Sequence, residues 1–163
     1  MKSQAIYSVI ARMTFLYDFV ATIVGYKKSI DYFISQLPYS EKEVIKILDA
    51  GCGAGLYSFE LLKKYENSHI TAFDLNGELV DRLRQKVLKK GLEKRIYSFT
   101  ANIQNPLVVI QNEKFDMIIT AGVLEYVSLE KTVKSLSNFL NSASRGAKKP
   151  FQPQISKEAT PNF

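Results

Sequence analysis

The residues best placed to do chemistry lie in one glycine-rich turn. Gly51, Gly53 and Gly55 alternate with small residues, and the acid Asp49 precedes them. Glycine is required where a backbone turns tightly and lies against a ligand, because a side chain there would clash with the turn or the ligand. The helix that follows opens with N–H groups that lack partners inside the helix and can face a ligand. The spacing therefore predicts a cofactor site.

A second acid closes the next apolar strand. Asp74 ends the strand predicted at 69–73 and lies 19 residues after Gly55. Open α/β folds place an acid at about this distance to bind the two hydroxyls of a ribose. A carboxylate only accepts hydrogen bonds, which suits a diol with two donors. The alternative interpretation is an acid at a strand end that simply faces water.

The glycine spacing distinguishes between nucleotide cofactors. A dinucleotide fingerprint needs Gly-x-Gly-x-x-Gly or a final Ala, and its last position falls on Leu56 or Ser58 in the two possible registers. A phosphate-binding P-loop would need Gly-Lys-Ser or Gly-Lys-Thr, which the sequence lacks. The pattern that remains is Asp-x-Gly-x-Gly-x-Gly, from Asp49 to Gly55.

With these motifs the chain resembles the class I S-adenosylmethionine-dependent methyltransferases over roughly residues 26–141. ILDAGCGAG (47–55) is similar to the family's first motif, and ITAFDLN (70–76) carries the ribose-binding acid. FDMIITAGVLEYV (115–127) resembles the fourth strand with its turn. Each piece alone is a weak signal, whereas three in this order and spacing are a strong one. The alternative is an α/β domain whose glycines only shape a turn.

The resemblance implies a set of contacts with S-adenosyl-L-methionine around the turn. The backbone of Gly51, Gly53 and Gly55 would pass against the methionine and ribose parts of the cofactor. Asp49 would orient the ammonium group, and Asp74 would accept hydrogen bonds from both ribose hydroxyls. A structural role for Asp49, capping the turn through hydrogen bonds to backbone N–H groups, is compatible with this.

The other implied contacts lie at neighbouring strand ends. Leu75 would line the adenine pocket, and Ile103 would offer its backbone N–H to the ring. Asn102 stands where the family usually has an Asp that accepts from the adenine amino group, so adenine recognition without charge assistance is expected to be weaker. The alternative for Asn102 is a loop residue after a strand. Cys52 in the turn and Ala121 after the fourth strand complete the set.

The sequence predicts neither a catalytic base nor a metal site. Cys52 lies between two glycines with no histidine near it to activate it as a nucleophile. The only histidine, His69, begins the second strand at the opposite end of the sheet, where a surface position is expected. Glu125 and Tyr126 follow the fourth strand at the mouth of the crevice. Methyl transfer from a sulfonium depends on in-line geometry and a dry pocket more than on protein acids and bases.

Sequence features of the fourth strand and the N-terminus favour a small-molecule methyl acceptor. Thr120-Ala121-Gly122-Val123 stands where methyltransferases of exocyclic amines carry an Asn-Pro-Pro-Tyr-like sequence, and a Pro-Cys nucleophile for cytosine is missing. The pattern is similar to small-molecule methyltransferases such as those of quinone biosynthesis. Tyr7 and Tyr17 are candidates for a lid over the acceptor, with packing in the core or an interface as the alternative.

Hydrophobic periodicity predicts strands alternating with helices. Strands are expected at 44–49, 69–73, 95–100 and 115–120, and helices at 4–24, 27–37, 55–66, 77–90 and 128–140. This order predicts an α/β fold with a doubly wound parallel sheet of the Rossmann-like methyltransferase type, and N-terminal lid helices. All candidate site residues then meet at the carboxyl ends of the strands.

The predicted organisation is a helical lid at 1–38, a partial cofactor-binding domain at 39–140 and a disordered tail at 141–163. The tail holds Pro150, Pro153 and Pro161 and few apolar residues, so it cannot supply the further strands of a complete sheet. The fold is expected to be incomplete at the C-terminus, which leaves the fourth strand as an edge open to self-association. The alternative to an active enzyme is a catalytically inactive cofactor-binding fragment or an interaction module.

The amino-acid composition indicates the class of protein and the cellular compartment. The 163 residues are 46% hydrophobic and 23% charged, as in one soluble domain. Arg12 and Asp18 interrupt the apolar N-terminus, which argues against a membrane span and a signal peptide. The single cysteine fits a reducing compartment, so the cytoplasm is expected.

The net charge of +6 raises the question of nucleic acid, since basic residues gather around the predicted helix 77–90. No aromatic residues interleave with them as stacking platforms would, so a solvated helix face is the favoured interpretation and nucleic acid is not expected as a partner.

Overall fold

The computed structural model of the chain describes residues 26–104 and 113–124 and the single positions 127, 128, 130, 131, 134, 137, 139 and 143. The bounded elements are α3 (Tyr26–Ser35), β1 (Lys46–Ala50), α4 (Leu56–Lys64), β2 (His69–Asp74), α5 (Gly77–Lys90), β3 (Ile96–Thr100) and β4 (Met117–Ile119). The predicted helix 4–24, with Tyr7 and Tyr17, lies outside the described residues.

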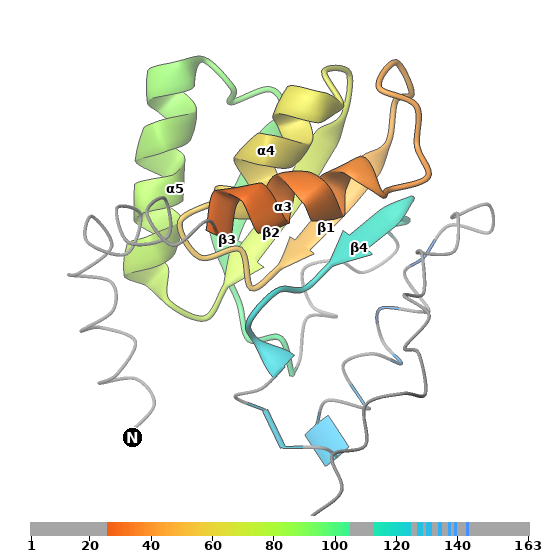
Figure 1. The fold of residues 1–163 in the computed structure, drawn as a ribbon. Helices are drawn as coiled ribbons and strands as arrows, with labels where there is room; N and C mark the ends of the chain where they lie inside the picture. Colours follow the sequence, from red (N-terminus) through yellow and green to blue (C-terminus); the bar gives the residue numbers. More distant parts are fainter. Residues whose placement is uncertain are drawn as a thin grey trace, which may run out of the picture.

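The strands form one parallel sheet in the order β3-β2-β1-β4 (Figure 1). The chain runs outward from β1 through β2 to β3 and then returns to the other side of β1. Open parallel sheets bind ligands where the strand order reverses in this way, at the carboxyl ends of the strands. Here that point lies between β1 and β4, and the predicted α/β fold class is confirmed.

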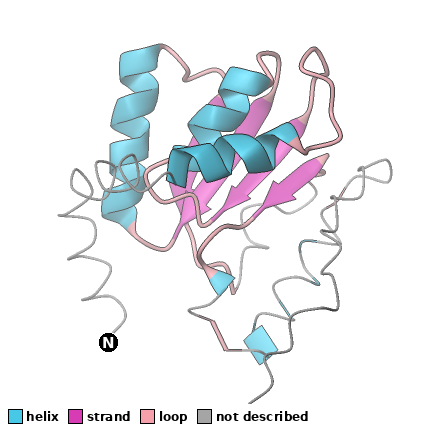
Figure 2. Cartoon of the chain, in the orientation of Figure 1, coloured by secondary structure: helices cyan, strands magenta, loops and turns pink. Residues whose placement is uncertain are grey.

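The sheet is covered on both faces, as a parallel sheet requires. α3, α4 and α5 lie over one face (Figures 1 and 2). Alternate strand residues pack to opposite sides: Ile47 joins the cluster under these helices, whereas Leu48 joins the cluster on the second face. In that second cluster Phe73 and Phe99 stack with ring centroids 5.6 Å apart, and Phe139 packs with them.

α3 belongs to the packed body of the domain. Ile30 and Ile34 are 1% and 3% exposed and lie in the cluster beneath the helices. The Phe33 ring meets Tyr57 of α4 edge-on, with centroids 6.2 Å apart. The predicted lid at 1–38 therefore includes a helix that packs on α4, and the boundary at residue 38 stays a prediction.

Three strands are shorter than the hydrophobic runs predict, and β3 is so by one residue at its start. β1 begins at Lys46 rather than at residue 44, because Val44 is 65% exposed and the Ile45 N–H donates to Ser68 Oγ at 3.2 Å. β4 spans Met117–Ile119 within the predicted 115–120. The residue before it, Asp116, accepts the Lys46 N–H on its carboxylate at 2.9 Å.

α5 has the predicted bounds because the residues that cap it, Asn76 and Gly91, directly flank it in the sequence. The Asn76 side chain accepts the N–H groups of Glu78 and Leu79 at 2.9 and 3.3 Å, and Gly91 ends the helix at φ 65°. Of the described positions of the predicted helix 128–140, residues 130, 131, 134, 137 and 139 are helical, whereas residue 128 is not.

One position of the predicted tail is paired. Ala143 forms a parallel bridge with Phe115, just before β4. The remaining residues of 141–163 lie outside the described residues. Disorder of the tail and self-association through the β4 edge stay predictions.

Two arginines of the basic cluster bind the domain's own backbone. The Arg95 guanidinium donates to the carbonyls of Leu62, Tyr65 and Ser68 at 3.2, 2.9 and 3.3 Å, which satisfies acceptors at the end of α4. Arg84 donates to the Ser98 carbonyl at 2.9 Å. Arg84 is nevertheless exposed on α5, as expected for a solvated helix face, while Arg95 lies beyond the helix and is half-buried.

We expect Arg95→Ala to lower the free energy of unfolding by about 2–3 kcal/mol, because three carbonyls lose a charged donor. Lys94→Ala removes the same charge one residue away at an exposed position and should change stability by less than about 0.5 kcal/mol. Urea denaturation of both variants measures the difference. Equal effects would mean that the hydrogen bonds of Arg95 contribute no net stability.

Candidate cofactor site

The glycine turn is held by the end of β2. The N–H groups of Gly51 and Cys52 both donate to the Phe73 carbonyl, at 2.8 and 3.0 Å. The next N–H, that of Gly53, donates to Asp74 Oδ2 at 2.9 Å. Three consecutive amides of the turn therefore bind the last two residues of β2, and the turn folds over the edge of the sheet.

Asp74 links the turn to the start of α5. Its Oδ1 accepts the N–H of Asn76, the N-cap residue of α5, at 2.8 Å. The residue is only 9% exposed, so the alternative of an acid that simply faces water is wrong. Each carboxylate oxygen accepts one of these backbone bonds and has a second lone-pair site. The carboxylate therefore keeps acceptor capacity for a diol.

Asp49 is a buried acid that binds α4. It is 2% exposed, and its Oδ2 accepts the Ser58 hydroxyl at 2.6 Å. Burial raises the pKa of this carboxyl from 3.8 to about 6, while the hydrogen bond from Ser58 opposes the rise and the charge of Asp74 adds to it. The Asp49 carboxylate also accepts a hydrogen bond from the Ser58 backbone in the first turn of α4, which agrees with the structural role predicted for it, while the amides of the turn bind the end of β2. A cation placed near Asp49 would be favoured, because it offsets both burial and the neighbouring acid.

The three positions of the turn require glycine for different structural reasons. A Cβ on Gly51 (φ 88°) would lie 2.1 Å from Val123 Cγ2, and one on Gly55 (φ 87°) would lie 2.4 Å from Leu83 Cδ1. Gly53 (φ 52°) has no atom of the described residues within 4 Å of such a Cβ. Packing therefore requires Gly51 and Gly55. Gly53 faces open space, where a ligand has room.

Cys52 is unsuited to nucleophilic chemistry. Burial raises the pKa of its thiol far above the usual range, and the charges of Asp49 and Asp74 add to the rise. The residue is 7% exposed and packs in the cluster beneath the helices. Its contribution to the site is the backbone N–H that binds β2.

The residues expected at the adenine side lie after β2 and β3, whose ends are level because Asp74 pairs with Thr100. Leu75 is 47% exposed, as an apolar side chain open to a ligand would be. Asn102 is exposed, and its Oδ1 accepts the Gln104 N–H at 2.9 Å. This bond is the loop role foreseen as the alternative for Asn102. Ile103 is 6% exposed and packs in the cluster on the second face.

The loop after β4 closes the other side of the turn. Ala121 and Val123 are half-buried, and Gly122 between them has φ 67°. Val123 packs against Gly51, which brings this loop onto the turn. Glu125 and Tyr126 lie outside the described residues.

Ser58 and Val123 contact the site, but the sequence did not identify them as site residues. Ser58 is the third residue of α4, and a polar residue in the first turn after a glycine loop could have been paired with Asp49. Val123 gives no such signal, since its contact with Gly51 spans more than seventy residues of sequence.

Among the described residues, no helix has the length and apolar character of a membrane span. The His, Cys, Asp and Glu side chains of the same residues form no group of three that could hold a metal ion.

Comparison with known proteins places the chain in a family. Residues 47–146 match the family described as "Methyltransferase domain". The chain belongs to this family. The match includes the glycine turn, Asp74 and the loop after β4, so the resemblance drawn from the three motifs is confirmed.

Curated relatives carry methyltransferase names. A malonyl-[acyl-carrier protein] O-methyltransferase of Priestia megaterium is 30% identical over 100 residues, which are 61% of this chain and 34% of the relative. Malonyl-[acyl-carrier protein] O-methyltransferase 2 of Ilyobacter polytropus is 24% identical over 90 residues, 55% of this chain and 32% of the relative. The chain thus spans about a third of the length of these relatives.

Solved structures share the fold. A TehB-like SAM-dependent methyltransferase from Corynebacterium glutamicum aligns with TM-score 0.64 and 20% identity, over 86% of this chain and 70% of that one. Coclaurine N-methyltransferase, solved with N-methylheliamine and SAH, aligns with TM-score 0.61 and 18% identity, over 74% of this chain and 33% of that one. These similarities confirm the Rossmann-like methyltransferase fold.

Gly53→Ala should fold but bind S-adenosylhomocysteine at least about tenfold more weakly, because its methyl group would enter the open space over the turn. Gly91→Ala is the matched control, since Gly91 has φ 65° and open space around its Cβ at the far end of α5. Both variants should lose about 1–2 kcal/mol of stability to the left-handed backbone. Calorimetric titration compares them, and normal binding by Gly53→Ala would place the ligand elsewhere.

Asp49→Asn should stabilise the ligand-free chain at pH 7.5. Because the folded pKa of about 6 exceeds the usual value of 3.8, the native state holds a proton that the unfolded chain releases between these values. Stability therefore falls as pH rises through this window, by on the order of 3 kcal/mol.

Urea denaturation of wild type and Asp49→Asn at pH 3.5 and 7.5 checks this prediction. The variant should be more stable only at pH 7.5, where wild-type Asp49 has lost its proton. Asp31→Asn, at an exposed position on α3, is the control and should show no such pH dependence. Equal stability of wild type and Asp49→Asn at both pH values would contradict the raised pKa.

Proposed function

We propose that this chain binds S-adenosylmethionine and is the cofactor-binding part of a methyltransferase for a small-molecule acceptor. The observation that carries the proposal is the glycine turn held over the end of β2, with Asp74 joining the turn to α5. Family membership over residues 47–146 supports the same activity. Coclaurine N-methyltransferase, which shares the fold, was solved with SAH.

The order of the strands across the sheet matches the order of the chemical groups along the cofactor. Asn102 and Ile103 follow β3, Asp74 and Leu75 end β2, and the turn follows β1. Adenine over β3, ribose over β2 and the amino-acid part over β1 and β4 would place each chemical group beside the residue type that suits it. The exposed Leu75 supplies an apolar contact for adenine, and Asp74 supplies acceptors for the diol.

Gly53 and Asp49 suit the amino-acid part. Gly53 leaves open space beside the backbone, so a ligand can lie against the turn. Asp49 is an acid whose charged form is disfavoured by burial and by Asp74, and a ligand ammonium group would relieve both effects. Binding should therefore weaken as pH falls below about 6, when Asp49 takes up a proton.

When bound, the cofactor supplies a methyl group on a sulfonium, which is already activated for transfer. The chain's own residues then have to bind, orient and exclude water. The Asp74 carboxylate would hold the ribose, and the Gly51–Gly53 backbone would lie against the amino-acid part. Val123 packs the loop after β4 onto the turn. Positioning of this kind accounts for much of the barrier lowering in bimolecular reactions.

A small-molecule acceptor is favoured over nucleic acid. The loop after β4 reads Thr120-Ala121-Gly122-Val123, without the Asn-Pro-Pro-Tyr-like sequence of base methyltransferases. Relatives named malonyl-[acyl-carrier protein] O-methyltransferases support an oxygen acceptor.

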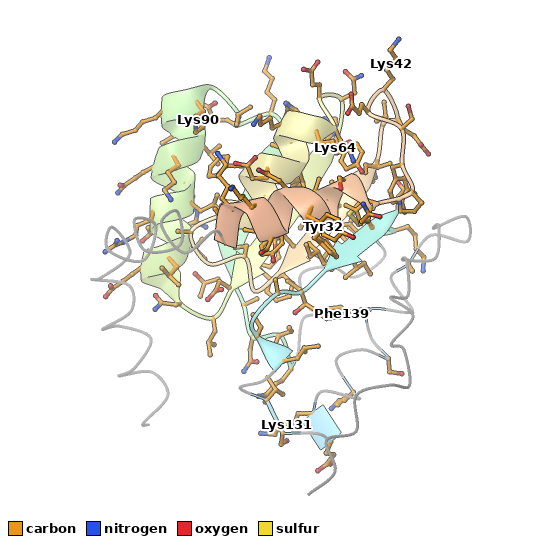
Figure 3. The ribbon with its side chains drawn as sticks, viewed as in Figure 1. Tyr32, Lys42, Lys64, Lys90, Lys131 and Phe139 are labelled. Carbon is orange, nitrogen blue, oxygen red and sulfur yellow. The ribbon has the colours of Figure 1, made fainter. Side chains whose placement is uncertain are left out.

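One curated relative, an uncharacterized RNA methyltransferase of Bdellovibrio bacteriovorus, is 32% identical over 85 residues, half of this chain. The basic residues do not support an RNA substrate, because Arg84 and Arg95 donate to backbone carbonyls. Lys64 and Lys90 lie at the ends of α4 and α5, away from the carboxyl ends of β1 and β2 (Figure 3).

A binding-only role remains the second candidate. The described sheet has four strands, and the chain spans about a third of its curated relatives. Such a chain would bind S-adenosylhomocysteine without transferring a methyl group. Titration with S-adenosylhomocysteine, followed by transfer of labelled methyl groups to a panel of small carboxylic acids, phenols and amines, separates the two candidates. No binding would contradict both.

Asp74→Ala should weaken S-adenosylhomocysteine binding about 10- to 100-fold, since it removes a charged acceptor worth roughly 1.5–3 kcal/mol. The mutation also frees the N–H groups of Gly53 and Asn76, so Asp74→Asn, which keeps the shape and one carbonyl oxygen, is measured beside it. Asp81→Asn, an exposed acid on α5, is the control and should bind normally. Unchanged affinity in both Asp74 variants would reject the ribose assignment.

A further inference from the structure

The sheet has two edge strands, and their surroundings differ. β4 lies at one edge, and Phe115 just before it pairs with Ala143 of the same chain. β3 lies at the other edge, and no further strand among the described residues pairs with it. An edge strand presents a row of backbone N–H and C=O groups that can pair with another chain. The free edge of β3 is therefore a surface that needs either a partner or protection.

The sequence of β3 is well suited to strand pairing. Its residues Ile96–Thr100 read IYSFT, so all but Ser98 are β-branched or aromatic and none is charged, Gly or Pro. Segments of this composition pair readily when they are exposed. Tyr97 is 66% exposed and lies with its ring centroid 5.7 Å from that of Phe99. An exposed and uncharged edge strand of this kind is a predicted site of self-association.

The direction of the backbone groups singles out Ser98 on this edge. The Ile70 N–H donates to the Arg95 carbonyl, and the Ala101 N–H donates to the Asp74 carbonyl. The odd-numbered residues of β3 thus direct their backbone groups toward β2. Because the direction alternates along a ladder, the N–H and C=O of Ser98 point away from β2. They lie at the middle of the free edge.

Arg84 of α5 covers the Ser98 carbonyl. Its Nη2 donates to that carbonyl at 2.9 Å, and its Nη1 donates to Asp81 Oδ1 at 3.0 Å, one turn earlier on the helix. A guanidinium can hold both acceptors at once because its donors form a planar fork. The side chain therefore occupies the acceptor that an added strand would use. It also places a charge beside a strand that has none of its own.

We propose that the free edge of β3 is a pairing surface for a second copy of this chain, and that Arg84 keeps this edge closed. Both backbone groups of Ser98 face the free side, so two copies related by a two-fold axis would exchange both hydrogen bonds at Ser98. Antiparallel pairing centred there sets Tyr97 of each copy opposite Phe99 of the other. Cross-strand aromatic pairs favour this arrangement. The hydrogen bond from Arg84 to Ser98 competes with it directly.

The oligomeric state of an Arg84 variant tests the proposal. Arg84→Gln removes the guanidinium without adding an apolar group. It should form dimers at a protein concentration at least about tenfold lower than wild type, because the Ser98 carbonyl is uncovered. Lys89→Gln removes the same charge at an exposed position of α5 and should behave as wild type. Analytical ultracentrifugation at about 1–100 μM measures the mass of each variant.

Two further measurements assign the contact to β3. Tyr97→Lys, combined with Arg84→Gln, places a charge opposite Phe99 of the other copy and should restore the wild-type mass. Hydrogen exchange should show the Ser98 amide protected in the Arg84→Gln dimer and unprotected in wild type. Association that persists with Tyr97→Lys, or that leaves the Ser98 amide unprotected, would place the contact elsewhere and overturn the proposal. Protection of this amide in wild type would show that Arg84 does not close the edge.

The variants also separate pairing at the edge from a general effect of charge. Wild-type mass for Arg84→Gln over the whole concentration range would overturn the proposal, and so would equal association of Arg84→Gln and Lys89→Gln. Arg84 is exposed, so Arg84→Gln should fold, which urea denaturation checks. If Arg84→Gln does not fold, Arg84→Lys replaces it, since an ammonium keeps the charge and lacks the planar fork. Association of folded Arg84→Lys above wild type supports the proposal, and wild-type mass overturns it.

Discussion

The site depends on three consecutive backbone amides that the end of β2 holds in place. Gly51 and Cys52 donate to one carbonyl, that of Phe73, and Gly53 donates to the carboxylate of Asp74. The turn therefore has its geometry only when β1 and β2 are paired in the observed register, Ala50 opposite Phe73. A slip of this register would remove the acceptors from the turn and the acid from the ribose position together. Folding of the sheet and assembly of the site are one event.

The residues of the turn and the two acids beside it differ in how much they contribute to stability and to ligand binding. Gly51 and Gly55 are required by contacts with Val123 and Leu83, whereas Gly53 faces open space. Asp74 stabilises the turn through its backbone bonds and keeps acceptor capacity for a ligand. Asp49 is buried at a cost to the ligand-free chain, as its raised pKa shows. Proteins often hold strained or poorly solvated groups where they bind ligands, and stability is recovered on binding.

Basic charge in this chain is partly structural. Arg95 satisfies three carbonyls around the end of α4, and Arg84 binds the Ser98 carbonyl from α5. A guanidinium suits this task because its five donors form a planar fork. The net charge of +6 is therefore a poor guide to partners, since two of the arginines that contribute to it also hold backbone carbonyls of the fold. The carboxyl edge of the sheet, which bears the acids Asp49 and Asp74, has the opposite character.

The sequence by itself determined the features that depend on residues close to one another along the chain. The alternation of strands and helices, both caps of α5 at Asn76 and Gly91, and the Asp-x-Gly-x-Gly-x-Gly turn are local patterns, so the fold class and the family followed from them. Only the tertiary structure decided which partners meet across the sheet: Ser58 on Asp49, the end of β2 on the amides of the turn, and Arg95 on α4. Such contacts join residues far apart in sequence. They are set by strand register and helix packing, for which a single sequence holds no local signal.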